Sequence, residues 1–411
     1  MNLYNLEELL VSQNPQFISG KIDEVGYKRD IFPQFCHELK NKKLIITLNG
    51  PRRSGKTFII KQGMRYLIEN GVSPKNVSYF QFSSILNDKE IIIKLADIFL
   101  KKYSIDGQKY LFLDEVQLVD FWQDQVKFLY DTFKDIKIIV SGSTSLFYKQ
   151  RSVESLAGRI YKIKLGALNF HEYLRFKKID EPSNNRAEFI TNLNIYRSEF
   201  RKYLSFGQYP EVVANSELDY KKYIHDLADQ IINFDALYFL SKINRQLFLD
   251  TIKTLSFDLA EEFSVNNVAK ILNSDRREIG EYVKILSELN LFNTCFNFGL
   301  KSMRKKLSGS KKIYALNSNL TLNVNGFDIS YLNDSRVYGK YLENYVYTRL
   351  IDKYEKVEYF RVDGKEIDFV TEKDCFEVKL RETHDLTNCE KISVKLNKKF
   401  NLLTEEEVFL L

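Results

Sequence analysis

The sequence of 411 residues lacks the long apolar runs of a membrane protein. No stretch of about 18 apolar residues occurs, and even the apolar segment from Ile91 to Leu100 is interrupted by Lys94 and Asp97. Residues 1–8 also lack the basic start and the apolar stretch of a secretory signal. We therefore expect a cytoplasmic protein that does not bind a membrane.

Cysteine and histidine are scarce as well, with four residues of each. The cysteines show no C-x-x-C spacing and are not accompanied by histidines at the spacing of metal ligands; they are Cys36, Cys295, Cys375 and Cys389. Neither a disulfide framework nor a zinc site is indicated. The net charge of +6 is small for this length and does not identify a partner.

Apolar residues, by contrast, are abundant. Hydrophobic residues make up 44% of the chain and aromatic residues 14%, which is ample for packed cores, so disorder is not expected. A chain of this length is too long for one ordinary core. We expect roughly two to four domains.

A glycine-rich motif directly follows a strand-like run at residues 43–48. The motif fits the pattern G-x-x-x-x-G-K-[ST] and consists of Gly50, Pro51, Arg52, Arg53, Ser54, Gly55, Lys56 and Thr57. In this pattern, backbone N–H groups and a helix N-terminus surround a phosphate. We expect Lys56 to reach the β- and γ-phosphates of ATP and the Thr57 hydroxyl to ligate Mg²⁺. The alternative is a surface turn that carries a lysine.

Two later strand-like runs end in polar residues. Residues 110–113 lead into Asp114 and Glu115. We expect Asp114 to hold Mg²⁺ through its water shell and Glu115 to orient and polarise the attacking water. Residues 136–140 lead into a run of small hydroxyl residues, where Ser143 is a candidate sensor of the γ-phosphate, because ligands bind at this edge of parallel sheets. Alternatively, these hydroxyls cap a helix that begins near Ser145.

Several short motifs occur in the order seen in a prokaryotic AAA+ ATPase family, which the sequence resembles over nearly its whole length. The motifs are GPRRSGKT (50–57), LDEVQ (113–117), SGS (141–143), LAGR (156–159), LNFHEYL (168–174) and GQYPE (207–211). Members of that family carry an AAA domain followed by a C-terminal domain of unknown function. The resemblance implies ATP hydrolysis and a role for Arg159 as an arginine finger or sensor, at the γ-phosphate of its own or a neighbouring subunit. Alternatively, Arg159 is a solvated surface charge.

Residues 244–316 have the organisation of a winged helix-turn-helix. Ser264 is expected to cap a first helix, and a second helix begins at Asp275 with Arg276 and Arg277 free to face outward. No acidic residue occurs in residues 291–326, and this basic wing predicts contact with nucleic-acid phosphates through Lys301, Arg304, Lys305, Lys306, Lys311 and Lys312. Alternatively, the winged helix only packs on the ATPase and the wing is solvated.

The C-terminal part is predicted to contain a helix at residues 339–354 and strands at 357–362, 366–371 and 374–380. Glu343 lies on the helix, Asp368 lies in the second strand, and Glu377 and Lys379 share a face of the third. This set resembles the PD-(D/E)XK nucleases. The resemblance implies that Glu343, Asp368 and Glu377 hold Mg²⁺ and that Lys379 steadies the activated water or the phosphate. The alternatives are an exposed salt-bridged strand pair and an inactive nuclease fold used for binding.

Together these features predict an α/β fold with a parallel-sheet P-loop AAA+ core, followed by a winged helix-turn-helix and a small α+β PD-(D/E)XK-like domain. The expected segments are an N-terminal segment (1–22), the AAA+ domain (23–178), a helical lid or linker (179–243), the winged helix (244–320) and the nuclease-like domain (325–411). The leading hypothesis is an ATP-driven, Mg²⁺-dependent protein that acts on DNA, either as a homo-oligomer or with a protein partner. The alternatives are a regulatory ATPase switch that signals to a protein and a replication-initiator-like DNA-binding ATPase that does not cut.

Overall fold

The computed structural model describes residues 3–23, 25–41, 43–83, 88–143, 156–239, 243–299, 309–381 and 386–411. The chain divides into two units, Met1–Gly166 and Ala167–Leu411, and each unit has its own hydrophobic core. The sequence predicts the end of the AAA+ domain at residue 178. By its contacts, however, α8 (Phe170–Phe176) belongs to the second unit.

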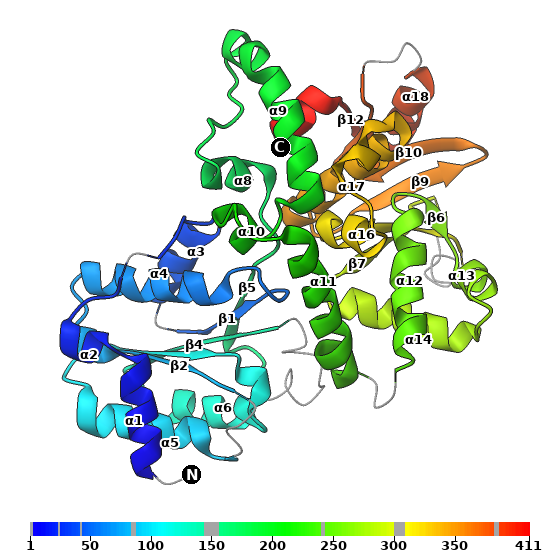
Figure 1. The fold of residues 1–411 in the computed structure, drawn as a ribbon. Coiled ribbons are helices and arrows are strands. Elements are labelled where there is room, and N and C mark those ends of the chain that lie inside the picture. Colours follow the sequence, from blue (N-terminus) through cyan, green and yellow to red (C-terminus); the bar gives the residue numbers. More distant parts are fainter. Residues whose placement is uncertain are drawn as a thin grey trace. The chain divides into compact units, whose positions relative to one another are not determined.

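The first unit is built on a parallel sheet with the strand order β2-β3-β4-β1-β5 (Figure 1). Its strands are β1 (Ile45–Asn49), β2 (Val77–Gln81), β3 (Lys109–Asp114), β4 (Ile136–Gly142) and β5 (Ile160–Lys164). On β3, Leu111 and Leu113 join one core, and Tyr110 and Phe112 join the other, as a side-chain period of two requires. The sheet is therefore covered on both faces, which is typical of parallel sheets.

Helices pack against the two faces of this sheet (Figure 1). On one face lie α3 (Phe32–Lys40) and α4 (Lys56–Glu69). On the other lie α1 (Leu3–Gln13), α2 (Gln16–Ser19), α5 (Ile91–Ile98) and α6 (Trp122–Thr132). The α/β fold class is thus confirmed, whereas the helix expected near Ser145 falls within residues 144–155, outside the described residues.

The second unit begins with helices, and the first of them, α8, precedes the lid or linker that the sequence predicts at residues 179–243. An N-terminal capping box starts α8, in which the Asn169 side chain accepts a hydrogen bond from the backbone N–H of Glu172. The next helices are α9 (Arg186–Phe206), α10 (Pro210–Ala214) and α11 (Tyr220–Gln230). Short 3₁₀ or π segments among the described residues are Pro74–Asn76, Phe99–Tyr103, Val116–Leu118, Ile231–Asp235, Ala236–Tyr238 and Ile329–Asn333. Across the described residues, no helix is both long and apolar enough to span a bilayer.

The following segment has the helix and strand order expected for the winged helix-turn-helix. Its elements are α12 (Arg245–Phe257), β6 (Glu262–Phe263), α13 (Val265–Ile271), α14 (Arg276–Glu288), β7 (Phe292–Cys295) and β8 (Lys311–Ala315). The predicted cap of α13 is present, because Ser264 accepts from the backbone N–H of Asn267. Asp275 caps α14 in the same way. The three strands are antiparallel in the order β6-β8-β7, so β8 is the central strand.

The C-terminal part places a long helix beside a four-stranded sheet of order β12-β11-β10-β9. Its elements are α16 (Ser318–Val324), α17 (Ser335–Lys353), β9 (Glu358–Val362), β10 (Lys365–Val370), β11 (Asp374–Val378), α18 (Thr387–Leu396), β12 (Lys399–Leu403) and α19 (Glu405–Phe409). The predicted hairpin pairing is present, because Phe369 of β10 lies opposite Phe376 of β11. This register places Asp368 beside Glu377.

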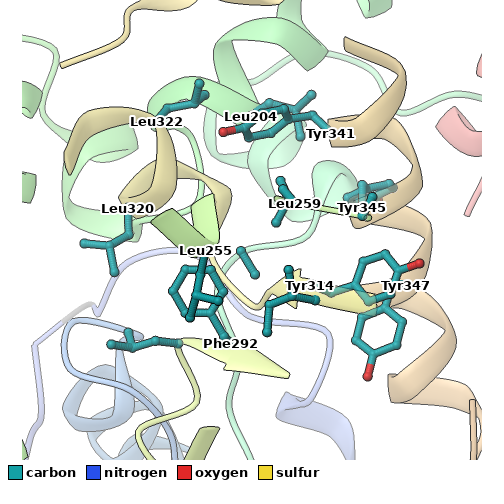
Figure 2. Packing of buried hydrophobic residues seen from close by; sticks show 14 of the residues in the cluster. Leu204, Leu255, Leu259, Phe292, Tyr314, Leu320, Leu322, Tyr341, Tyr345 and Tyr347 are labelled. Atoms are coloured by element: carbon teal, nitrogen blue, oxygen red, sulfur yellow. The ribbon is translucent and has the colours of Figure 1, made fainter. Parts of the chain in front are cut away.

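One hydrophobic core joins the winged-helix segment to the C-terminal part. Figure 2 shows Tyr314 beside Tyr347 of α17, and Leu255 and Phe292 belong to the same core cluster. The rings of Tyr314 and Tyr347 stack with centroids 4.1 Å apart and an interplanar angle of 11°. A ring pair of this kind adds about 0.5–1.5 kcal/mol to simple burial. The central strand β8 is therefore fixed against α17.

Candidate functional site

The predicted phosphate-binding loop connects the end of β1 to the start of α4. A Cβ atom at Gly50 would lie 2.1 Å from the carbonyl oxygen of Leu165, so no larger residue fits there without movement. Gly55 has a φ of 93°, which is accessible to glycine and costly for other residues. Both glycines of the motif are thus required by the backbone itself.

The side chain of Lys56 forms hydrogen bonds to the backbone of its own loop. Its Nζ atom donates hydrogen bonds to the carbonyl oxygens of Gly50 and Pro51, each at 3.0 Å. The side chain is buried although it carries a charge. An ammonium group is therefore held inside the loop, where the motif predicts the β- and γ-phosphates.

Asp114, at the end of β3, is the centre of a hydrogen-bond network at the same edge of the sheet. Thr57 Oγ1 donates to Asp114 Oδ2 at 2.6 Å, and the Tyr79 hydroxyl donates to the same oxygen at 3.0 Å. The Ser141 hydroxyl donates to Asp114 Oδ1. Burial, together with the Asp114 charge, raises the pKa of Tyr79, so Tyr79 keeps its proton as a donor. The two motifs predicted from the sequence therefore meet directly at Thr57 and Asp114.

Glu115 and Ser143 lie next to this network. Glu115 has a φ of 58°, an uncommon conformation for a glutamate, and its carboxylate accepts a hydrogen bond from Gln117 Nε2. Ser143 directly follows β4 and is buried. Both residues are thus at the carboxyl edge of the sheet, where the sequence predicts them.

Arg29 is a component of the site that the sequence motifs do not reveal. Its guanidinium donates to the carbonyl oxygen of Ser54 at 2.8 Å and to that of Gly166 at 3.2 Å, and the residue is only 7% exposed. Hydrogen bonds from a charged donor are stronger than neutral ones. Arg29 therefore anchors the loop through its backbone, and Tyr79 is a second residue of the site that no motif marks.

The arrangement fits ATP with Mg²⁺. Ser54 Oγ is buried and has no hydrogen-bond partner within the described part of the chain, so the loop holds an unused polar group. The oxygens of Thr57 and Asp114 form the all-oxygen set that Mg²⁺ prefers. When bound, Mg²⁺ would offset negative charge on the phosphates. Arg52 and Arg53 lie on the outer part of the loop and add positive charge there.

Arg159 lies at the edge of the sheet opposite to the loop. Its carbonyl oxygen accepts from the backbone N–H of Ile45 at the start of β1, whereas the loop follows the end of β1. Its Nε lies 3.4 Å from Oδ1 of Asp131. Five residues of strand span about 16 Å, so Arg159 lies too far from the loop for the γ-phosphate of its own chain, which is one of the alternatives that the sequence leaves open. A role at the nucleotide of a neighbouring subunit stays a prediction.

In the second unit, the four residues predicted for a nuclease-like site do come together. The backbone N–H of Asp368 donates to Glu377 Oε2 at 3.3 Å, and Asp368 Oδ2 accepts from the backbone N–H of Val378 at 2.8 Å. Lys379 Nζ lies 2.6 Å from Glu377 Oε1. Burial and the Asp368 charge raise the pKa of both Glu343 and Glu377, to about 7 for Glu343.

Lys312 also belongs to this cluster, although the sequence places it in the exposed basic wing that is expected to contact nucleic acid. That expectation is wrong, because Lys312 is only 4% exposed and its Nζ lies 2.9 Å from Glu343 Oε1 and 2.7 Å from Glu366 Oε1. Asp368 Oδ1 is 3.7 Å away. Burial alone would lower the pKa of Lys312, but the neighbouring carboxylates outweigh it and keep the pKa above its ordinary value. The buried ammonium is therefore charged.

The predicted nucleic-acid contacts fall into two groups. Arg276 and Arg277 form the first turn of α14 and are exposed. Lys301, Arg304, Lys305 and Lys306 lie outside the described residues. Of the predicted surface, the helical pair and the two wing residues Lys311 and Lys312 are therefore described.

Comparison with known families agrees with the geometry of the phosphate-binding loop. Residues 42–174 match the family model of an AAA domain, and residues 197–330 match a domain of unknown function (DUF8612). This part of the chain is thus similar to an AAA domain, and the phosphate-binding loop lies within it. The second match covers the helices and strands between α9 and α16, including the winged-helix segment.

Similar proteins occur in bacteria and archaea. An uncharacterized protein of Haemophilus influenzae is 25% identical over 84% of this chain and 84% of its own length. Two uncharacterized proteins of Methanocaldococcus jannaschii are 27% identical (79% of this chain, 71% of that protein) and 30% identical (66% and 60%). Among solved structures, Cdc6p from Pyrobaculum aerophilum matches with a TM-score of 0.31 at 9% identity, covering 77% of this chain and 97% of that chain. The AAA+ assignment rests on the family match and on the loop geometry.

Proposed function

We propose that this chain binds ATP with Mg²⁺ in the loop at residues 50–57, hydrolyses it, and uses the cycle to act on DNA. The observation that carries the first part is the 2.6 Å hydrogen bond between Thr57 and Asp114, which joins two motifs 57 residues apart in the sequence. A surface turn with the same residues would not be expected to form a hydrogen bond to a carboxylate at the end of a strand. Support also comes from the match of residues 42–174 to an AAA domain.

Each residue of this edge has a proposed part in hydrolysis. Lys56 binds the β- and γ-phosphates, and Thr57 and Asp114 provide oxygen ligands for Mg²⁺. Glu115 orients the attacking water and receives its proton, and Gln117 holds the Glu115 carboxylate in place. These groups come from α4, β3 and the turn after β3, so the sheet fixes their separation.

Ser143 is proposed as the sensor of the γ-phosphate. It follows β4 beside Ser141, whose hydroxyl already bonds to Asp114. Arg159 is proposed to act only at the nucleotide of a neighbouring subunit, which would make ATP turnover depend on self-association. Its present partner, Asp131, is an exposed carboxylate that such a contact could displace.

For DNA, the support is the exposed pair Arg276 and Arg277 at the start of α14. Asp275 caps the helix and fixes both arginines in its first turn. No carboxylate of the described residues forms an ion pair with either one, so both charges face solvent. Exposed cations at the start of the second helix of a helix-turn-helix are suited to contact phosphates. The alternative remains a regulatory switch that signals to a protein partner.

The test is a paired measurement of ATP hydrolysis with and without single- and double-stranded DNA, over a series of salt concentrations. We compare the natural chain with the double variant Arg276→Glu/Arg277→Glu. A matched control is Lys221→Glu/Lys222→Glu, which reverses two adjacent exposed charges in the first turn of α11.

The proposal expects DNA to stimulate ATP hydrolysis in the natural chain and in the control. In the arginine variant, DNA binding should weaken and its salt slope should fall by about 2, because each phosphate contact contributes about 0.9 to that slope. An equal rate of ATP hydrolysis with and without DNA would reject the proposal that the chain acts on DNA. It would favour a regulatory switch that signals to a protein partner. Absence of any hydrolysis, with or without DNA, would reject the ATPase itself.

A further inference from the structure

A charged lysine lies inside the carboxylate cluster of the C-terminal part. Lys312 Nζ is within hydrogen-bond distance of Glu343 and Glu366, and it lies 3.7 Å from Asp368. Lys312 comes from β8, the central strand of the winged-helix sheet, whereas the carboxylates come from α17 and β10. An ammonium group from one part of the unit thus neutralises acidic groups of another part.

The carboxylates that the nuclease resemblance assigns to Mg²⁺ are already engaged by the protein. Glu343 Oε1 accepts from both Lys312 and the Tyr314 hydroxyl. Asp368 Oδ2 accepts from Val378 N–H, and both oxygens of Glu377 have partners, Lys379 and the Asp368 N–H. Over the described ranges, no group of three or more Asp, Glu, His or Cys residues is arranged to hold a metal ion. As arranged, the cluster does not fit a divalent cation.

We propose that Lys312 is the resident cation of this cluster and stands in place of the divalent metal that a nuclease site would hold. A buried carboxylate pair requires positive charge, and either a metal ion or an ammonium group can supply it. Both together would bring repulsion between the ammonium and the metal at close range. The C-terminal part therefore binds no divalent cation at this cluster while Lys312 is in place.

Lys312 is not free to move aside. Its strand is paired on both edges, to Glu262 of β6 and to Cys295 of β7. Tyr314, two residues further along the strand and on the same face, stacks on Tyr347 and bonds to Glu343. The ammonium is thus fixed by the sheet, unlike a flexible surface lysine. The charge of this cluster does not depend on ATP hydrolysis in the first unit.

The test measures Mn²⁺ binding to the full chain without nucleotide, through the loss of the EPR signal of free Mn²⁺. The variants are Lys312→Met, Asp368→Asn and the double variant Lys312→Met/Asp368→Asn. Lys379→Met is the matched control, because it removes a lysine that pairs with Glu377 but does not lie between Glu343 and Asp368. Mn²⁺ bound in the first unit should be the same in all variants, so it does not affect the difference in bound Mn²⁺ between them.

We expect the natural chain and Asp368→Asn to bind equal amounts of Mn²⁺. Lys312→Met should bind one additional Mn²⁺ per chain, the double variant should lose it again, and Lys379→Met should not gain it. A folded Lys312→Met chain without additional Mn²⁺ would overturn the proposal, and so would an equal gain in Lys379→Met. If Lys312→Met does not fold, Lys312→Gln takes its place. The natural chain and Asp368→Asn can be compared even if no Lys312 variant folds. If the natural chain binds more Mn²⁺ than Asp368→Asn does, the proposal is also overturned.

Discussion

Substitution of Gly50 tests the geometry of the phosphate-binding loop most sharply. In Gly50→Ala, the added Cβ would lie 2.1 Å from the Leu165 carbonyl oxygen and 3.0 Å from Ser54 Oγ. The carbonyl belongs to the backbone and cannot rotate away, so the loop itself must shift. Overpacking of this kind costs about 1–3 kcal/mol. ATP binding requires the loop to return to its natural conformation, and this return costs the same amount, about 1–3 kcal/mol. At about 1.4 kcal/mol per tenfold, the affinity for ATP should fall by about 5- to 150-fold.

The assay is a titration with a fluorescent ATP analogue, together with thermal unfolding to establish that the variant is folded. Gly339→Ala is the control, because its added Cβ would meet no atom within 4 Å. The control should bind ATP as the natural chain does. A folded Gly50→Ala chain whose ATP affinity stays within twofold of the natural chain would refute the close approach of the loop to Leu165.

Three further substitutions test other contacts. Arg29→Ala removes hydrogen bonds to Ser54 and Gly166, each worth about 1.5–3 kcal/mol from a charged donor. The variant should therefore have a lower unfolding temperature and bind ATP more weakly. An unchanged unfolding temperature and an unchanged ATP affinity would show that Arg29 does not anchor the loop. Tyr79→Phe removes one donor to Asp114 and should cost about 2 kcal/mol in urea unfolding, and a cost near zero would exclude that bond. Burial and Asp368 raise the pKa of Glu343 to about 7 from an ordinary 4.5. Folding then favours its protonated form, a contribution present below about pH 4.5 and lost as the pH rises through about 7. Glu343→Gln should therefore flatten the fall in unfolding temperature over this range, and an equally steep fall would contradict the assignment.

The local part of the ATP site could be predicted from sequence because its motifs are short and adjoin strands. The glycine-rich loop follows β1, and Asp114 ends β3, so the parallel sheet brings them to one edge. The same rule could have excluded a contact between Arg159 and its own nucleotide, since Arg159 precedes its strand and the loop follows a parallel one. Strand direction was thus an unused signal.

Arg29 and Lys312 could not be found in this way. Arg29 is 25 residues from Ser54 and forms no motif with it, so only the folded backbone reveals the contact. Lys312 adjoins Lys311 in a segment without acidic residues, which reads as one solvated basic surface. Because side chains alternate along β8, one of the two lysines must face α17, but the strand is buried on both sides and alternation does not say which. The three carboxylates predicted nearby, Glu343, Asp368 and Glu377, were the hint that a cation was needed there.

The most direct test of the account is the ATP turnover of Glu115→Gln, measured beside its ATP affinity. ATP binding should be retained, because Lys56 and Thr57 are unchanged, and turnover should fall by about 10²- to 10⁴-fold, the usual effect of removing a general base. Glu8→Gln, an exposed glutamate on α1, is the control and should hydrolyse ATP as the natural chain does. Turnover of Glu115→Gln at the natural rate would contradict the claim that the residues at the end of β3 perform hydrolysis.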